Sequence, residues 1–112
     1  MASCVRAAIA TAVALASIFE ASASAEPKTI EVVIEHFVFV PSSVEVAPRD
    51  TVVFTNHDIA PHTATAVDGS WTTREIPRGR SETLVVPSNG AGVYVCRYHP
   101  AMRGQLVIAP AR

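Results

Sequence analysis

The chain contains the stretch Cys96-Arg97-Tyr98-His99-Pro100-Ala101-Met102, directly after the apolar run Gly92-Val93-Tyr94-Val95. Its thiol, imidazole and thioether side chains are each separated by three positions. Soft sulfur donors together with imidazole favour copper, especially where one Cys, two His and one Met converge. Because Pro100 restricts the backbone, the segment predicts a loop that returns His99 and Met102 toward Cys96.

This stretch lacks a second histidine, and the best candidate elsewhere is His62, which lies 34 residues before Cys96 (96 − 62). A strand ending at Cys96 and an adjacent strand leaving His62 would bring the two side chains to one end of a sandwich. Three strong ligands and one weak thioether form the trigonal arrangement of blue copper sites. The sequence therefore predicts one copper ion bound by His62, Cys96, His99 and, as the axial ligand, Met102.

The other candidate residues are predicted to have ordinary structural roles. His57 lies in a polar loop and is expected to be solvated, and His36 is expected to be a hydrogen-bonded histidine within a strand. Trp71 is expected to pack in an irregular loop rather than to relay electrons. Free cysteines are most often buried core thiols, but the regular spacing of the two donors after Cys96 favours its assignment as a ligand.

Residues 1–25 are predicted to be a secretory signal peptide that is removed. Arg6 supplies a positive n-region, residues 7–19 form an alanine-rich apolar segment, and Ala23-Ser24-Ala25 is a small-residue cleavage site. The apolar segment is too short for a typical membrane span, so no membrane anchor is expected. We therefore expect a secreted protein with a mature chain of 87 residues (112 − 25), residues 26–112, forming one domain.

Charge and cysteine content restrict the function further. Removing one basic and one acidic residue with the signal leaves 8 basic (9 − 1) and 9 acidic (10 − 1) residues. This near-neutral balance argues against a nucleic-acid partner. Loss of Cys4 leaves Cys96 without a cysteine for an internal disulfide. Because a lone thiol in an oxidising compartment is prone to oxidation or mispairing, a metal is its expected occupant.

The rest of the chain reads as short extended segments separated by Pro, Gly, Asn and Asp turn signals. The segments expected to be extended are residues 29–40, 43–47, 51–55, 62–67, 81–86, 92–96 and 105–108. No segment after the signal shows apolar residues at helical spacing for more than a turn. Short strands at this spacing are typical of an all-β sandwich or barrel. We predict one all-β sandwich of seven to eight short strands, with Greek-key connections implied by the class.

These features resemble the cupredoxins, and specifically the small periplasmic amicyanin/plastocyanin-like group, which implies a periplasmic location. The matching segments are Phe37-Val38-Phe39-Val40-Pro41, residues 46–52, Asn56, Pro61-His62-Thr63 and residues 92–104. The short Cys-x2-His-x2-Met spacing is the feature most similar to amicyanin. The resemblance implies a cupredoxin-like sandwich with one copper ion. It also implies a monomeric, non-enzymatic carrier of single electrons between redox proteins, such as a periplasmic dehydrogenase and a c-type cytochrome.

The chain departs from the cupredoxin pattern at three positions near these motifs. Thr63 stands where many cupredoxins have an Asn that braces the copper loop, and Arg97 stands where a Ser or Thr usually follows the Cys. Arg49 replaces a glycine that is common in its turn. None of these changes removes a ligand, so they bear on the potential and the partner rather than on the metal.

The resemblance also implies where electrons leave the site. His99 would lie near the surface, with Pro61, Pro100 and Ala101 forming a small apolar docking rim.

The same ligand set is compatible with a second role, copper carriage or storage without a redox partner. A hydrolase or transferase with a Cys–His nucleophile is disfavoured, because no third orienting residue or oxyanion motif is found. Structural zinc is disfavoured because Met is a poor zinc ligand.

Overall fold

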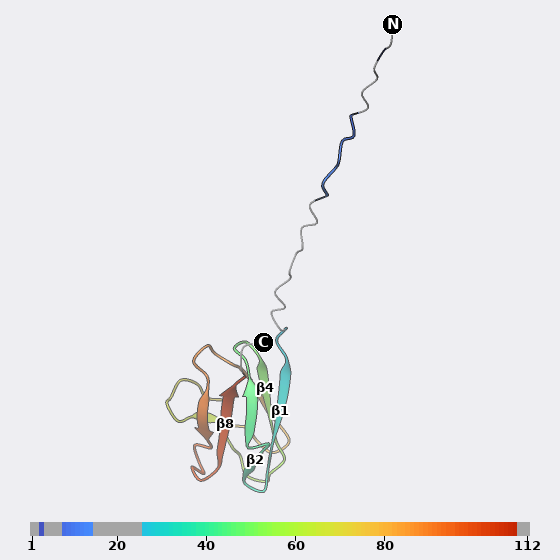
Figure 1. The fold of residues 1–112 in the computed structure, drawn as a ribbon. Helices are drawn as coiled ribbons and strands as arrows, with labels where there is room; N and C mark the ends of the chain where they lie inside the picture. The colour runs from blue at the N-terminus through green and yellow to red at the C-terminus, as the bar shows by residue number, and fades with distance from the viewer. Residues whose placement is uncertain (1–2, 4–7, 15–25, 110–112) are drawn as a thin grey trace.

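The computed structural model describes residue 3, residues 8–14 and residues 26–109. Eight strands form two four-stranded sheets that make a sandwich (Figure 1). The strands are β1 (Thr29–Glu35), β2 (Val38–Val40), β3 (Ser43–Val46), β4 (Thr51–Asn56), β5 (Thr65–Ala66), β6 (Ser81–Val85), β7 (Gly92–Val95) and β8 (Arg103–Ile108). Within the described residues, no helix is long and apolar enough to cross a membrane. The predicted all-β sandwich of seven to eight strands is confirmed.

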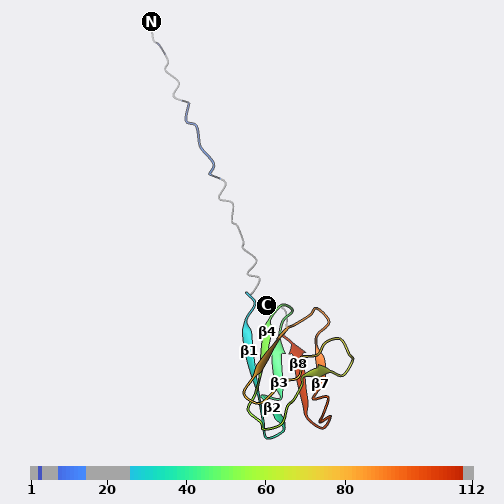
Figure 2. The same ribbon diagram turned by 180° about the vertical axis from the view of Figure 1, so that it is seen from behind.

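The strand order is β2-β1-β4-β6 in one sheet and β3-β8-β7-β5 in the other. Each sheet contains one parallel pair, β1 with β4 and β3 with β8, whereas the remaining pairs are antiparallel. Figure 2 shows the second sheet from behind, with β3, β8 and β7 side by side. Because β1 and β4 run in the same direction, the segments that follow them leave from the same end of the sandwich.

The core follows from the period-two pattern of the strands. Val32 and Ile34 of β1 and Val52 and Phe54 of β4 are fully buried, while their sequence neighbours are at least partly exposed. Successive side chains of a strand point to opposite faces, so this alternation places one face of the sheet against the second sheet. Burial of these side chains stabilises the fold by roughly 25 cal/mol for each Å² of apolar surface removed from water.

Aromatic rings fill the centre of the core. Tyr94 lies edge-on to Phe39 and Phe54, with ring centroids 4.7 and 5.5 Å away. Trp71 stacks on Phe54 at 6.4 Å, which confirms its predicted packing role. The cross-strand partner of Tyr94 is Gly104, where a methyl group would overlap the Tyr94 ring. A residue without a side chain is therefore required at position 104.

Two predicted strands are shorter in the structure than expected. Residues 29–40 are divided by a two-residue turn, His36-Phe37, with positive φ angles of 52° and 59°. Both turn N–H groups donate to the Asp58 carboxylate rather than to a neighbouring strand. In residues 62–67 only Thr65–Ala66 forms a strand, because the His62 backbone pairs with Ile76 in an isolated bridge.

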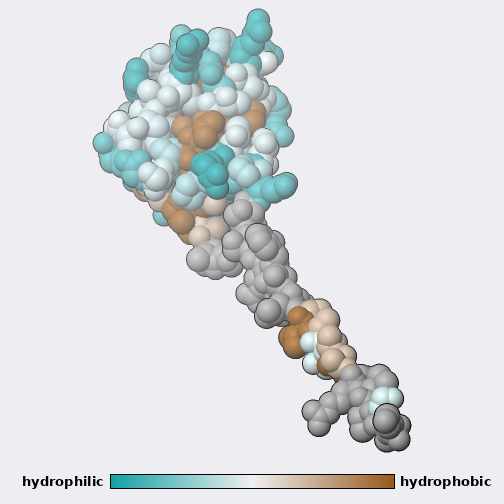
Figure 3. All heavy atoms as spheres, turned by 90° about the horizontal axis from the view of Figure 1, so that it is seen from above, coloured by the Kyte–Doolittle hydropathy of each residue, from teal (hydrophilic) through white to brown (hydrophobic). Residues whose placement is uncertain are grey.

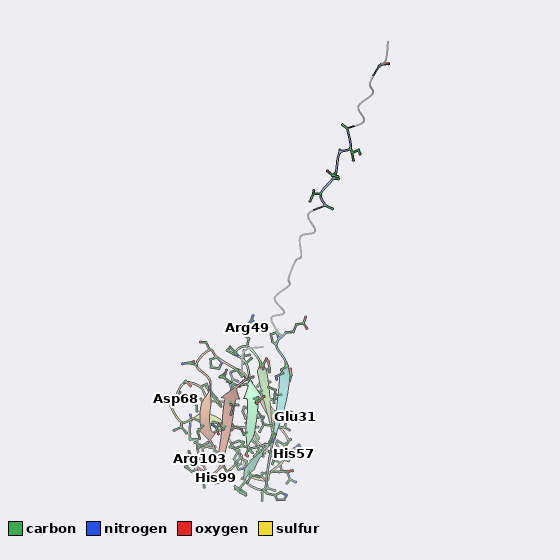
Figure 4. The ribbon with its side chains drawn as sticks, in the orientation of Figure 1. Glu31, Arg49, His57, Asp68, His99 and Arg103 are labelled. Atoms are coloured by element: carbon green, nitrogen blue, oxygen red, sulfur yellow. The ribbon has the colours of Figure 1, made fainter. Side chains whose placement is uncertain are left out.

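The end of the sandwich away from the Cys96 loop is largely polar. Viewed from that end, the domain surface is mostly hydrophilic or intermediate, with small separate hydrophobic areas (Figure 3). Arg49 lies at this end (Figure 4), in the Pro48-Arg49 turn, and has a φ of 74°. That left-handed conformation favours glycine, so the Gly-to-Arg departure identified in the sequence falls at a position of local backbone strain.

Candidate metal centre

The predicted ligands converge at one end of the sandwich. Three segments meet there, namely the β1–β2 turn, the loop that follows β4, and residues 96–102 between β7 and β8. Figure 4 shows His57, from the second segment, and His99, from the third, at this end and Arg49 at the opposite end. The site is thus built from both sheets, because β4 belongs to one and β7 to the other.

Residues 96–102 form two successive hydrogen-bonded turns. The His99 N–H donates to the Cys96 carbonyl at 3.2 Å, and the Met102 N–H donates to the His99 carbonyl at 2.9 Å. The Cys96 N–H in turn donates to the Met102 carbonyl at 3.2 Å, which closes the loop. Pro100 occupies the second position of the His99–Met102 turn, where its fixed φ suits the backbone. This geometry explains why the three donors are spaced three residues apart.

His62 is the fixed member of the pair of histidines. Its side chain is fully buried, and its Nδ1 lies 3.6 Å from the Cys96 Sγ. The His62 backbone is held on both sides, since its N–H donates to the Ile76 carbonyl and its own carbonyl accepts from the Ile76 N–H. The histidine predicted to reach Cys96 from a distant part of the chain does so.

His99 completes a cluster of three donors. Its Nδ1 lies 3.7 Å from the Cys96 Sγ, and the ligand atoms of His62, Cys96 and His99 all lie within 4.8 Å of one another. The two ring centroids are 5.2 Å apart. His99 is partly exposed, whereas Cys96 is fully buried. Both imidazoles therefore present the same nitrogen to one thiol, and only His99 extends toward solvent.

The donor set fits copper. One cysteine sulfur and two imidazole nitrogens are the strong ligands of a blue copper site, and a thioether is its usual weak axial ligand. Met102 is 4% exposed, and its backbone is joined to Cys96 by the loop hydrogen bond. The side chains of His62, Cys96, His99 and Met102 are positioned as in a type 1 copper site.

Thr63 ties the Cys96 loop to the segment that carries His62. Its N–H donates to the Cys96 Sγ at 3.5 Å, and its Oγ1 accepts from the Arg97 N–H at 2.9 Å. A second hydroxyl contact joins Thr63 to Thr65 at 3.0 Å. The threonine, which departs from the asparagine of the cupredoxin pattern, thus still supplies a side-chain brace to the loop. The Arg97 side chain is exposed.

Sequence reasoning missed Asp58, the residue behind His62. The His62 Nε2 lies 2.8 Å from the Asp58 Oδ2, and the Asp58 side chain is 11% exposed. Burial raises the pKa of the Asp58 carboxyl, but hydrogen bonds from Phe37, His62 and His36 outweigh this effect and hold that pKa below its usual range. The available signal was an acidic residue four positions before a candidate ligand. Spacing alone could not show that an irregular loop brings the two together.

The remaining histidines differ in how well they were predicted. His57 is exposed in its loop, as expected. His36 is not a strand residue, because it lies in the exposed β1–β2 turn with its N–H bonded to Asp58. The next residue, Phe37, lies edge-on to both imidazoles, with centroids 5.2 Å from His62 and 5.0 Å from His99. The sequence pattern does not indicate this aromatic cover, because it predicts a continuous strand over residues 29–40.

Comparison with known proteins identifies the family. Residues 7–108 match the model of the cupredoxin-like domain, so the chain belongs to this family. This confirms the resemblance inferred from the sequence. Among curated proteins, no sequence matches the chain significantly.

Solved structures share the fold. An oxidised amicyanin variant is 25% identical with a TM-score of 0.62, over 71% of this chain and 81% of that one. The Cu(I) form of another amicyanin variant is 27% identical with a TM-score of 0.59, over 72% and 82% of the two chains. A copper-containing nitrite reductase from Thermus scotoductus SA-01 is 22% identical with a TM-score of 0.64, and the match covers 78% of this chain and 24% of the reductase. This last likeness shows the fold alone.

Proposed function

We propose that the protein carries single electrons between redox partners, with one copper ion bound by His62, Cys96, His99 and Met102. The observation that carries this proposal is the convergence of the His62, Cys96 and His99 donor atoms within 4.8 Å of one another. When bound, copper supplies a reversible Cu(II)/Cu(I) couple whose potential depends on the axial ligand and on the surroundings of the cysteine sulfur.

The protein's own contribution is to hold the donors in place before and after the electron moves. Cys96 follows β7 directly, is fully buried, and accepts a hydrogen bond from the Thr63 N–H. The two turns of residues 96–102 set the backbone positions of His99 and Met102. Ligands fixed by packing and by hydrogen bonds need little rearrangement between oxidation states. This property suits electron transfer better than it suits bond chemistry, so we assign no enzymatic activity.

His99 is the proposed route for electrons to and from the site. It is the partly exposed member of the donor cluster, and Pro61, Pro100 and Ala101 are exposed. These apolar residues would form a small rim for a redox protein such as a periplasmic dehydrogenase or a c-type cytochrome. Electron-transfer encounters are weak and bury little surface, so a small apolar rim would be enough to dock a redox protein. The proposed carrier acts as a monomer.

The proposed location is the periplasm, reached through the signal peptide in residues 1–25. The Arg6 n-region and the cleavage site Ala23-Ser24-Ala25 lie outside the described residues. Edman sequencing of the exported protein should begin at Glu26. A protein retained in the cytoplasm with residues 1–25 intact would contradict this part of the proposal.

Visible absorption and electron paramagnetic resonance spectra of the Cu(II) protein test the site. We expect an intense thiolate-to-copper band and a small copper hyperfine splitting. Cys96→Ala and His62→Ala should abolish this signature. His57→Ala, which removes an exposed histidine five residues before His62, should retain it. An ordinary weak tetragonal spectrum in the unaltered protein would overturn the proposal.

Copper carriage with the same ligands is distinguished by kinetics. An electron carrier should cycle reversibly with a redox dye and should release Cu(I) slowly to a competing chelator. Rapid Cu(I) release with slow electron exchange would favour carriage or storage instead.

A further inference from the structure

We infer that Asp58 is a positioning residue of the metal centre that lowers the Cu(II)/Cu(I) reduction potential through His62 and holds the Phe37 cover over both imidazoles. This inference rests on the proposed function. It is carried by the three hydrogen bonds that the Asp58 carboxylate accepts, one from the His62 ring and two from the β1–β2 turn.

The first of these bonds sets the tautomer of His62. An ionised carboxylate only accepts hydrogen bonds, so at 2.8 Å from the Asp58 Oδ2 the His62 Nε2 must carry the proton. In the neutral imidazole the His62 Nδ1 then keeps its lone pair, and this is the nitrogen that lies 3.6 Å from the Cys96 Sγ. Asp58 therefore prepares the correct nitrogen of His62 for a metal before any metal arrives.

The same bond places a negative charge behind one imidazole only. A carboxylate that accepts the outer N–H of a metal-binding histidine raises the basicity of that ligand. Both the basicity and the nearby charge favour the more highly charged Cu(II) state over Cu(I), so the potential falls. His99 has no corresponding acceptor, because no described residue forms a hydrogen bond with its Nε2.

The other two bonds hold a strained turn. His36 and Phe37 both have positive φ, a conformation that costs L-residues other than Gly roughly 1–2 kcal/mol each. A two-residue turn of this kind usually contains Asn-Gly or Asp-Gly. Here the His36 N–H donates to the Asp58 Oδ1 at 2.7 Å and the Phe37 N–H donates to the Oδ2 at 2.9 Å. Backbone strain maintained by its surroundings is typical of functional sites.

The strained turn directs Phe37 to the site. The Phe37 ring is edge-on to His62 and to His99 at 5.2 and 5.0 Å, although the residue is 45% exposed. An apolar ring in contact with both imidazoles limits their access to water. The Asp58 carboxylate thus sets the tautomer of His62, places a negative charge behind it and holds the Phe37 ring over both imidazoles.

The test compares Asp58→Asn, Asp58→Glu and Asp68→Asn in the full chain as expressed and loaded with Cu(II). Asp68 is a matched control, because it is an exposed aspartate whose hydrogen bonds are made locally with Ser70. Asp58→Asn should shift the Cu(II)/Cu(I) equilibrium about tenfold toward Cu(I), which raises the potential by about 59 mV. It should also weaken Cu(II) binding by at least about tenfold and speed hydrogen exchange at the His36 and Phe37 amides.

Asp58→Glu keeps the charge, so its reduction potential should be closer to that of the unaltered protein. Asp68→Asn should leave the potential unchanged. A potential for Asp58→Asn equal to that of Asp68→Asn, with the blue spectrum intact, overturns the inference while the proposed function stands. If the unaltered protein gives no blue spectrum, the proposed function fails instead.

A second measurement does not depend on whether Asp58→Asn folds or on copper. Nuclear magnetic resonance of the unaltered metal-free protein should show the His62 Nε2 proton shifted downfield and protected from exchange. The His99 ring protons should exchange rapidly. Rapid exchange of the His62 Nε2 proton would overturn the inference.

Discussion

The two imidazoles of the proposed copper site lie at nearly equal distances from Cys96 but are held in different ways. His62 is buried, its backbone bonds to Ile76 in both directions, and its outer nitrogen bonds to Asp58. His99 is partly exposed and is held by the turns of its own loop. One side of the site is therefore fixed by the fold, and the other by a seven-residue loop. A metal would join a rigid half to a more adjustable half.

Copper loading should have the largest effect on the stability of the two halves of the site. A ligand that binds only the native state, at a free concentration about 1,000 times its Kd, stabilises that state by about 4.1 kcal/mol. The gain should appear as a higher midpoint of thermal unfolding. Hydrogen exchange in residues 97–102 should slow more than in residues 57–64, because the loop half is less constrained without metal. Equal stabilisation of Cys96→Ala by copper would contradict this.

Alanine substitution of each histidine should lower the free energy of unfolding of the metal-free protein by different amounts. His62→Ala should lower the free energy of unfolding by about 3 kcal/mol, because it leaves a buried cavity and removes a hydrogen-bond partner of Asp58. His99→Ala should lower it by less than about 1 kcal/mol, since the ring is partly exposed. Urea unfolding of both variants without copper measures the difference. Equal losses would show that the two halves are equally fixed.

Thr63 connects the two halves, so its hydroxyl should have an intermediate effect. Thr63→Val retains the shape but removes the acceptor for the Arg97 N–H. We expect a loss of about 1 kcal/mol, because a partly buried N–H is left without its partner. Thr63→Ser keeps the hydroxyl and should recover most of the stability. If Val and Ser at position 63 gave the same unfolding midpoint, the Thr63 hydroxyl would not contribute to stability.

Arg97→Ser should have the smallest effect on stability. The side chain is exposed, and such substitutions usually change the free energy of unfolding by no more than about 0.5 kcal/mol. Because Arg97 lies directly after Cys96 on the more exposed half, its removal should instead reduce the salt dependence of electron exchange with an acidic partner. Stopped-flow rates at several ionic strengths test this. A large loss of stability would show that the loop depends on the Arg97 side chain.

Much of this site could be predicted because its donors have distinctive chemistry. The Cys96, His99 and Met102 spacing reports a local loop, and two consecutive turns are enough to produce it. The alternation in β1 and β4 likewise reports directly on the buried face. His62 was harder, but a Pro-His pair at the end of a polar loop was a sufficient signal once a second imidazole was required.

The unpredicted parts depend on contacts between distant segments. The His36-Phe37 turn lacks glycine, and its left-handed backbone depends on Asp58, 22 and 21 residues further along. A pattern of neighbouring residue types cannot report such a bond. The local β propensity of residues 29–40 therefore favoured one continuous strand where the structure has a turn. The same contact gives Asp58 its place behind His62.

The pairing of β3 with β8 has a consequence for biosynthesis. Ser43 lies opposite Gln105, 62 positions later in the chain (105 − 43), and β8 is the only neighbour of β3 among the described strands. Sheet pairings between segments so distant in sequence form slowly. Among the described strands, β8, which follows residues 96–102, is also the last to be synthesised. The pairing of β3 and the closure of the metal-binding loop must therefore be completed after β8 has been synthesised, and until then β3 lacks its partner strand.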